Sequence, residues 1–424
     1  MTGVDRLPAV AASLRRAARR GTPVFVTDLA TLGAAAEAVE RAFPDPWIRQ
    51  YSVKANDVTA IVATLWKRGF GANVVSRGEW AIARRAGIPN ERISLEGVGK
   101  TSADLAAAVR ASREGVPLAW LSVESPDEVE ALAALLDRPG PERPVVEVLL
   151  RLNPAVVPEA PGGLAVGAST SKFGMTETEL TASVERALAG GLRPRGIHLH
   201  VGSQLGAVDA WRDAVRRGLA LLGLVRGGLP SFDTLDVGGG FPVAPLGVEA
   251  PSPERFAHEL PALLDAVPPE RRPGRMAVEP GRALVARAGW LVASVLHVRD
   301  RDPWQIVLDA GMTELIRPAL YGARHGVVAL TSLGRPLDGP HSPADPSVTT
   351  TRVEGPICES TDSLGEHPLP PLRRGDLVAI RDAGAYGASM ASAYNGRARP
   401  AQLLLEADGR LRVGRSRGSL RSLG

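Results

Sequence analysis

The chain has 424 residues, of which 44% are hydrophobic and 23% charged, and its formal net charge is +4. This length and composition suit two folded domains and exclude a disordered or fibrous protein. The basic residues are spread along the chain, which argues against a nucleic-acid partner. We find no long uncharged apolar run, and therefore expect no membrane segment and a cytoplasmic location.

The cysteine and lysine residues are few, which makes their positions informative. The single cysteine, Cys358, cannot form an internal disulfide, and no cysteine or histidine cluster has metal-ligand spacing. We therefore expect no metal. Lysine occurs only at positions 54, 67, 100 and 172, and Lys54 lies in an apolar segment. A lysine in such surroundings loses its proton readily, as an amine must do to form a Schiff base.

Short apolar or β-branched runs alternate with helix-like segments through the first two thirds of the chain, as a parallel sheet requires. The eight predicted strands are 47–55, 71–76, 93–97, 118–125, 145–153, 196–202, 234–240 and 275–281. Helical spacing of apolar residues predicts helices at 57–68, 102–113, 126–136, 177–188 and 211–225. Eight such units predict an α/β fold of the (β/α)8 TIM-barrel type, spanning residues 30–283.

A second, β-rich domain, a barrel or sandwich, is predicted for residues 284–424, because the alternation with helices stops after Arg282. Its predicted strands are 290–298, 304–309, 349–353, 376–381 and 401–406. Residues 23–27 read as a strand before the barrel, so residues 1–29 could join this domain. Two Pro/Gly-rich stretches are predicted loops: 334–347, and 154–172, which either covers a site at the barrel mouth or is a surface insert.

A (β/α)8 barrel carries its active site at the carboxyl ends of its strands, and chemically capable residues fall there. Lys54 ends the first predicted strand, and His198 and His200 end the sixth. The Gly238-Gly239-Gly240 run ends the seventh, and Glu279-Pro-Gly-Arg282 ends the eighth. The glycines would let backbone amides approach a phosphate, although a glycine triplet can also be a plain turn. Glu279 could pair with a ring nitrogen, or form a salt bridge to a barrel arginine.

The ordered motifs of the whole chain resemble the fold-type III decarboxylases that depend on pyridoxal 5'-phosphate (PLP), and among them diaminopimelate decarboxylases. In the predicted barrel the matching segments are YSVKAN (51–56), VVSRGE (74–79), GVGK (97–100), SKFG (171–174), HLHVGSQ (198–204), GGG (238–240) and EPGR (279–282). In the second domain they are DAGM (309–312), IRPALY (316–321), GPICES (355–360) and DAGAYG (382–387). The resemblance implies a carboxy-lyase of lysine biosynthesis that converts meso-diaminopimelate to L-lysine and carbon dioxide.

The resemblance implies a role for each matching residue. Lys54 would hold PLP covalently, His200 would stack on its ring, and Glu279 would pair with the ring nitrogen. The phosphate would be held by Ser203, Gly238, Gly239, Gly240, Gly281, Arg282 and Tyr386. The distal end of the amino-acid substrate would be bound by Arg282, Arg317, Tyr321, Glu359 and Tyr386. Cys358 would donate the proton that replaces the carboxylate, and would come from the partner subunit of a homodimer.

Two departures from the family leave the substrate open. Asn73 stands where these decarboxylases often have aspartate, and 154–170 lacks the histidine-containing pattern of the diaminopimelate enzymes. A related decarboxylase of ornithine, lysine, carboxynorspermidine, or a carrier-bound or natural-product intermediate is the alternative. A racemase of this fold would carry arginine in place of Glu279, and a silent homologue would not be expected to retain Lys54, His200, Glu279 and Cys358 together.

Overall fold

The computed structural model describes residues 5–137, 144–157, 159, 167–168, 171–245, 248–339, 341, 344–419 and 421. The chain forms two compact units. The barrel unit comprises Ala36–Pro242 and Ala250–Gly281, and the sheet unit comprises Met1–Ala35, Val243–Glu249 and Arg282–Gly424. Each unit is built from its own strands and has its own hydrophobic core.

Eight parallel strands close into a barrel, which confirms the predicted fold class. They are β2 (Ile48–Ser52), β3 (Gly71–Val74), β4 (Ile93–Leu95), β5 (Trp120–Val123), β6 (Glu147–Leu152), β7 (Arg193–Leu199), β8 (Thr234–Asp236) and β9 (Arg275–Val278). The barrel closes where β2 pairs with β9, with Ile48 opposite Ala277. Seven of the predicted runs contain a barrel strand that is shorter than the run, whereas β7 begins at Arg193, before the predicted start at residue 196, and overlaps that run only as far as Leu199.

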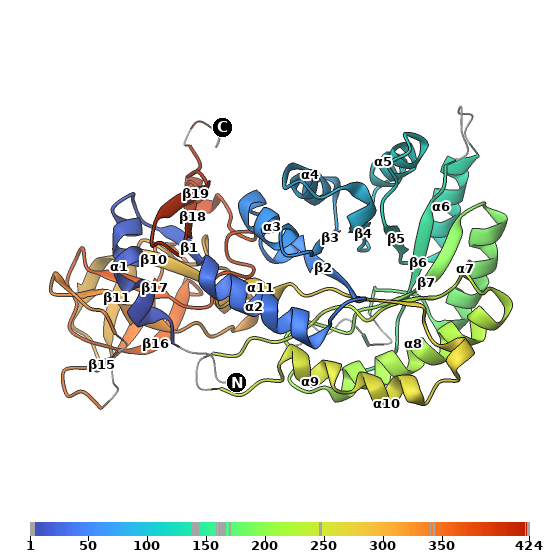
Figure 1. The fold of residues 1–424 in the computed structure, drawn as a ribbon. Helices are drawn as coiled ribbons and strands as arrows, with labels where there is room; N and C mark the ends of the chain where they lie inside the picture. Colours follow the sequence, from blue (N-terminus) through green and yellow to red (C-terminus); the bar gives the residue numbers. More distant parts are fainter. Residues whose placement is uncertain are drawn as a thin grey trace. The chain divides into compact units, whose positions relative to one another are not determined.

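The helices of the barrel unit lie outside its strands (Figure 1). They are α3 (Thr59–Trp66), α4 (Arg77–Arg85), α5 (Ser102–Arg113), α6 (Pro126–Leu136), α7 (Glu177–Ala189), α8 (Asp209–Gly228), α9 (Pro253–Ala257) and α10 (Leu260–Asp265). Helix α2 (Leu29–Ala42) runs from the sheet unit into the barrel unit. Short helical turns occur at η1 (Val53–Ala55), η2 (Asn90–Arg92) and η4 (Pro269–Arg271).

Side-chain caps decide where several of these helices begin. Thr101 and Asp104 form a reciprocal capping box at the start of α5, and Thr176 and Glu179 form another at α7. Ser125 accepts a hydrogen bond from the Glu128 amide at α6, where Pro126 suits the first helical position. Each cap satisfies amides that have no partner inside the helix. Helices α5 and α6 therefore begin a few residues after β4 and β5, whereas a long segment separates α7 from β6.

The sheet unit is built on nine strands, which confirms the predicted β-rich character of this part of the chain. They are β1 (Val24–Asp28), β10 (Gly289–Arg299), β11 (Trp304–Leu308), β12 (Val327–Ala329), β15 (Thr349–Glu354), β16 (Ser363–Leu369), β17 (Leu377–Ile380), β18 (Ala401–Leu405) and β19 (Leu411–Arg415). A separate hairpin joins β13 (Thr331–Ser332) to β14 (Arg335–Pro336), and β14 lies within the predicted loop at 334–347. Its helical segments are α1 (Leu7–Ala18), α11 (Arg282–Val285), α12 (Arg317–Tyr321) and η5 (Tyr394–Gly396).

Strand β1 lies inside this sheet, pairing with β10 on one side and β18 on the other. Its side chains alternate between two hydrophobic cores, as the period of a strand requires. Phe25 packs into the core that contains Leu291 and Ile380, whereas Val24 and Val26 pack with α1. The N-terminal strand is therefore an integral part of the sheet unit.

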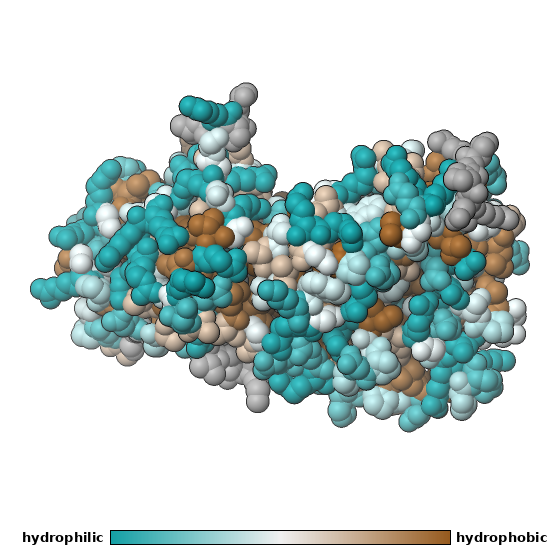
Figure 2. Space-filling model, turned by 45° about the horizontal axis from the view of Figure 1, so that its top comes forward, coloured by the Kyte–Doolittle hydropathy of each residue, from teal (hydrophilic) through white to brown (hydrophobic). Residues whose placement is uncertain are grey.

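Hydrophilic side chains cover most of the surface drawn in Figure 2, and apolar side chains form separate patches among them. Large exposed apolar residues are correspondingly scattered in sequence, as at Val116, Leu224 and Trp304. No helix among the described residues combines the length and the hydropathy that a membrane span needs.

The predicted loop at 154–172 lies partly outside the described residues. Of the part that is described, Val156 donates a backbone hydrogen bond to Gly167 at 2.9 Å, and Gly167 donates one to Val201 at 3.0 Å. Asn153 also donates from its side chain to the carbonyl of Ala168 at 3.0 Å. The described residues of the segment are thus attached to the chain that follows β7.

Candidate active site

Lys54 lies in the helical turn η1, directly after β2 and not within the strand itself. The turn is held by Tyr51, whose hydroxyl donates to the carbonyl of Asn56 at 2.9 Å. The positive charge of Lys54 contributes to lowering the pKa of His200 and acts on that of Glu96. The amine is therefore electrostatically coupled to residues after β4 and β7, at the same end of the barrel.

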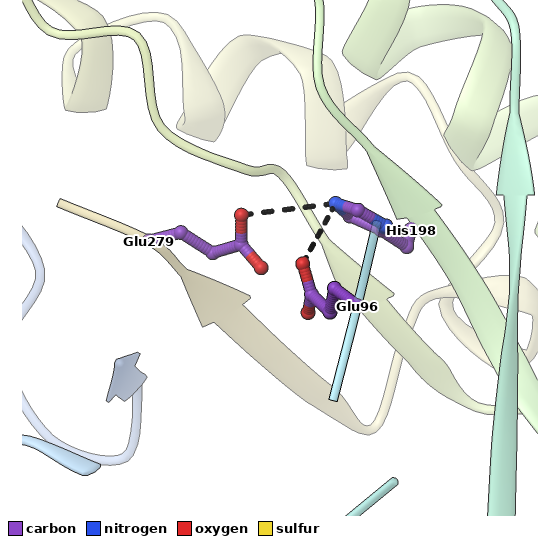
Figure 3. Close-up of side chains that lie close together, drawn as sticks. All are labelled: Glu96, His198 and Glu279. Atoms are coloured by element: carbon purple, nitrogen blue, oxygen red, sulfur yellow. Dashed lines mark ion pairs between the residues drawn. The ribbon is translucent and has the colours of Figure 1, made fainter. Parts of the chain in front are cut away.

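A buried group of two carboxyls and an imidazole lies at this end of the barrel (Figure 3). Nε2 of His198 lies 3.5 Å from Glu96 Oε2 and 3.7 Å from Glu279 Oε2. Nδ1 of His198 is 2.5 Å from the hydroxyl of Ser122. The three residues come from β4, β7 and β9 or the residue just beyond, so only closure of the barrel assembles them.

Asn73, on β3, is the hydrogen-bond partner that holds Glu279. Its side-chain amide donates to Glu279 Oε1 at 2.5 Å, and both residues are buried. The departure from aspartate noted in the sequence thus replaces an acid with a neutral donor. A hydrogen bond donated to a carboxylate favours its ionised form. Asn73 therefore stabilises negative charge on Glu279.

Two acids that adjoin Glu279, namely Glu96 and Asp236, have raised pKa values. Burial raises the pKa of Glu96 to about 8, and the neighbouring Glu279 contributes to this rise. Burial, again with Glu279, raises the pKa of Asp236 well above its ordinary value. Three acids this close in a buried site cannot all ionise, so the cluster shares its charge.

His198 and His200 are both neutral at physiological pH. Burial lowers the pKa of His198 to about 4, against the opposing effect of Glu96. Burial, followed by the charge of Lys54, lowers the pKa of His200 well below its ordinary value. Nδ1 of His200 accepts a hydrogen bond from the Gly239 amide at 3.3 Å. An uncharged imidazole can lie against a cationic ring without repelling it.

The glycine run after β8 lies where the neighbouring backbone leaves no room for side chains. Gly238 has φ of +70° and Gly240 has φ of +96°, which side chains rarely adopt. A Cβ on Gly238 would collide with the carbonyl oxygen of Leu199, and one on Gly239 with that of Glu279. The turn therefore brings backbone closer to β7 and β9 than any side chain would allow, as an anion-binding turn requires.

Two further predicted residues flank this part of the site. Ser203 lies in the segment after β7, next to Gly202, whose carbonyl oxygen approaches Gly240. A Cβ on Gly281 would lie 3.1 Å from that of Ser52 and 3.3 Å from that of Ala55, so Gly281 adjoins the turn that carries Lys54.

In the sheet unit, two buried arginines adjoin two tyrosines. The guanidinium of Arg282 lies over the ring of Tyr386, 4.7 Å from its centroid. Burial, followed by the charge of Arg282, lowers the pKa of Arg317 to about 10. Tyr321 and Tyr386 also act on the pKa of Arg317. Neighbouring buried cations are costly on their own and favour an anion between them.

Tyr386 has a strained backbone, with φ of +58°. A bulky residue in this region is uncommon, and such strain is often found where a side chain is aimed at a ligand. The strain is consistent with a functional position for Tyr386.

Cys358 and Glu359 lie beside the turn η5 of the same unit. Cys358 is exposed, and its sulfur is 3.7 Å from the side-chain nitrogen of Asn395. Tyr394 donates its hydroxyl to Glu359 Oε1 at 2.6 Å, and this hydrogen bond raises the pKa of Tyr394. The thiol is thus accessible, as a proton donor to a substrate needs to be.

The predicted site residues therefore fall into two sets. Lys54, His200, Ser203, Gly238, Gly239, Gly240, Glu279 and Gly281 belong to the barrel unit, and Arg282, Arg317, Tyr321, Cys358, Glu359 and Tyr386 to the sheet unit. Sequence reasoning missed the roles of Glu96 and Asp236 in the carboxyl cluster. Both are acids at strand ends, and that position was the signal available for finding them.

The sequence expectation of no metal rested on local spacing, which cannot detect a cluster assembled by the barrel. The ligand atoms of Glu96, His198 and Glu279 all lie within 4.8 Å of one another. The group could instead bind a protonated ring nitrogen through the carboxyl of Glu279, which the side-chain amide of Asn73 holds in place. A flat cofactor with a cationic ring nitrogen, an anionic phosphate and an aldehyde suits this carboxylate, the glycine turn and Lys54.

A family model and two relatives connect the chain to the pyridoxal-dependent decarboxylases. The family model described as "Pyridoxal-dependent decarboxylase, pyridoxal binding domain" matches residues 29–286. The diaminopimelate decarboxylase of Aquifex aeolicus is 34% identical over 396 residues, covering 91% of this chain and 87% of that protein. That of Deinococcus radiodurans is 35% identical over 396 residues, covering 92% of each.

A solved structure shows the same likeness over both units. Diaminopimelate decarboxylase from Helicobacter pylori, crystallised in complex with L-lysine, is 29% identical to this chain. It superposes with a TM-score of 0.84, and the match covers 95% of each chain.

Proposed function

Because this chain belongs to the pyridoxal-dependent decarboxylases, we propose that it converts meso-diaminopimelate to L-lysine and carbon dioxide. The observation that carries the chemistry is the buried Glu279 carboxylate, held by Asn73 at 2.5 Å, at the same barrel end as Lys54. The substrate is supported by relatives of 34% and 35% identity named for this reaction. A relative crystallised with L-lysine also supports it.

The cofactor of this family is PLP, which supplies an electron-withdrawing ring that accepts the electron pair left when carbon dioxide departs. In our proposal Lys54 holds PLP covalently and His200 lies against its ring. Glu279 keeps the ring nitrogen protonated, which strengthens this electron withdrawal. An arginine at that position would weaken it, so the acid favours decarboxylation over racemisation.

The phosphate in this proposal is bound by the amides of Gly238, Gly239 and Gly240, by Ser203 and Gly281, and by Arg282 and Tyr386. The support in the barrel unit is the close approach of the glycine turn to neighbouring backbone. The support in the sheet unit is the contact between Arg282 and the ring of Tyr386.

Substrate recognition is assigned to the sheet unit. Arg282, Arg317 and Tyr321 bind the distal carboxylate, with Tyr386 nearby, and Glu359 binds the distal amine. Two buried cations suit a carboxylate, and a carboxylate suits an ammonium group. Cys358 then donates a proton to the carbon that has lost its carboxylate. We propose that Cys358 acts in the partner's site of a cytoplasmic homodimer.

A substrate panel tests the proposal directly. PLP-loaded protein is incubated separately with meso-diaminopimelate, L-lysine, L-ornithine and carboxynorspermidine, and carbon dioxide and the amine product are measured. We expect turnover of meso-diaminopimelate with formation of L-lysine. Turnover of another amino acid instead would replace the proposed substrate, and the absence of carbon dioxide from all four would contradict the decarboxylase assignment for these substrates.

A further inference from the structure

The side chain of His325 connects Arg317 to the backbone at the end of β17. Nη1 of Arg317 is 3.0 Å from His325 Nε2, and His325 Nδ1 is 2.9 Å from the carbonyl oxygen of Arg381. A guanidinium can only donate and a carbonyl can only accept. Nε2 therefore accepts and Nδ1 carries the hydrogen, so the contacts select one neutral tautomer of His325.

The surroundings keep this imidazole neutral. His325 is 3% exposed and Arg317 is 7% exposed. Burial lowers the pKa of His325 to about 4, the hydrogen bond to the Arg381 carbonyl opposes this, and the charges of Arg317 and Arg282 contribute to the lowering. The acceptor at Nε2 is therefore present throughout the neutral pH range.

Because His325 is neutral, its contact with Arg317 does not cancel the positive charge of the guanidinium. In the described part of the chain, no carboxylate forms an ion pair with it. Asp382, whose charge acts on Arg317, lies 3.5 Å from Arg287 instead. A carboxylate in place of His325 would bind the guanidinium more strongly, but it would also cancel the charge that an anionic ligand needs. A neutral acceptor orients Arg317 without this loss.

The carbonyl that anchors His325 is itself held in place. The side chain of Arg381 pairs with Asp5 at 2.6 Å and lies over the ring of Trp290, 5.0 Å from its centroid. Its backbone amide donates to the carbonyl of Gly326 at 2.8 Å. The orientation of Arg317 is thus tied to the sheet through His325.

We propose that His325 is a positioning residue that orients Arg317 to bind a substrate carboxylate remote from the reacting carbon. This rests on the function proposed above, in which Arg317 binds the distal carboxylate of meso-diaminopimelate. That carboxylate remains in the product L-lysine and is absent from cadaverine. The two diamines therefore separate recognition by Arg317 from all other contacts.

The experiment uses PLP-loaded protein and the variants His325→Ala and His325→Gln. Binding of L-lysine and of cadaverine is measured by calorimetry, and KM and kcat are measured with meso-diaminopimelate. For His325→Ala we expect Kd for L-lysine and KM each to rise about tenfold or more, because an arginine without its partner is no longer oriented. Kd for cadaverine should change less than about twofold, because cadaverine makes no contact that needs Arg317.

His325→Gln should recover most of the L-lysine affinity, because its amide oxygen can accept from Arg317. His367→Ala is the matched control, since the ring of His367 hydrogen-bonds to the carbonyl of Leu364. It should bind both amines as the unmodified chain does.

Unchanged L-lysine binding in His325→Ala would overturn the inference, as would an equal loss for L-lysine and cadaverine, which would indicate a general disturbance. Failure of the proposed function has a different signature, namely an unmodified chain that releases no carbon dioxide from meso-diaminopimelate. The L-lysine and cadaverine comparison still decides the role of His325 in that case.

Discussion

At the scale of single residues, protonation decides what the barrel cluster can do. Asn73 donates to Glu279, whereas Oε1 of Glu96 has no hydrogen-bond donor within the described residues. The two acids therefore have different roles, although both are buried at the same barrel end. Glu279 accepts the Asn73 hydrogen bond, whereas Glu96 holds a proton at neutral pH, because a buried carboxyl without a donor is more stable when neutral.

The raised pKa of Glu96 predicts a pH dependence of stability. The pKa is about 8 in the folded chain, against an ordinary value of 4.5. The folded state therefore binds more protons than the unfolded state between these values. The stabilisation is fully present below pH 4.5 and is lost as the pH rises through 8. The unmodified chain should lose stability across this window more steeply than Glu96→Gln, whose amide does not titrate.

The measurement is chemical denaturation of PLP-free protein from about pH 5 to about pH 8.5, which covers most of this window. His198 and His325, with pKa values lowered to about 4, favour folding as the pH rises toward 6.5. Both proteins share the His325 effect, whereas Glu96→Gln also removes the charge that opposes the lowering of the His198 pKa. Glu91→Gln, at an exposed position, is the control and should follow the unmodified chain. Parallel curves for Glu96→Gln and the unmodified chain would show that Glu96 holds no extra proton.

At the scale of elements, short segments after strands carry the site. The turn η1 places Lys54, and the glycine run after β8 brings its amides beside β7 and β9. The capping boxes of α5 and α7 start those helices at defined residues. Local chemistry therefore determines where each segment begins, and the barrel determines which segments meet.

The glycine turn predicts a strong effect of one methyl group. Gly239→Ala would place a Cβ against the carbonyl oxygen of Glu279, so the turn must shift away from the phosphate it is proposed to bind. We expect PLP affinity to fall about tenfold or more, since several phosphate hydrogen bonds lengthen together. Titration with PLP, followed by absorbance, measures this.

Gly227→Ala provides the matched control, because nothing lies within 4 Å of the Cβ it would add. It should bind PLP as the unmodified chain does. Full PLP affinity in Gly239→Ala would remove the turn from the proposed phosphate site.

At the scale of the whole molecule, the proposed homodimer can be tested by mixing two inactive variants. Lys54→Ala should bind no PLP covalently, and Cys358→Ala should retain the absorbance of bound PLP but lose most turnover. If the two residues act from different subunits, mixed dimers contain one site with both native residues. Exchange of subunits between the two inactive variants should therefore restore about a quarter of the native activity.

The measurement is activity after mixing the variants and allowing subunits to exchange, with sedimentation to confirm the dimer. Each variant incubated alone is the control and should stay inactive. No recovery despite exchange would place Lys54 and Cys358 of each site on the same chain, and a monomer in sedimentation would contradict the shared site altogether.

Much of the architecture follows from the sequence. The alternation of apolar runs with helical segments identified every barrel strand, because strands buried on both faces must be apolar along their length. The helical spacing of apolar residues similarly predicted α5 and α6, whose predicted and observed bounds agree. Sequence reasoning did not identify the short strands β12 and β19, because their residues are stabilised by pairing with distant strands more than by local pattern.

The candidate site likewise contains residues that could be identified from the sequence and properties that only the folded chain shows. Lys54, the glycine run and Glu279 could be identified from the sequence as strand-end residues, because a barrel places strand ends together whatever the helices between them. Three other properties came from the folded chain: Glu96 holds a proton beside Glu279, Asn73 supports the charge, and His325 contacts Arg317. These properties depend on distances and burial between residues far apart in the chain, and no local pattern of residues encodes them.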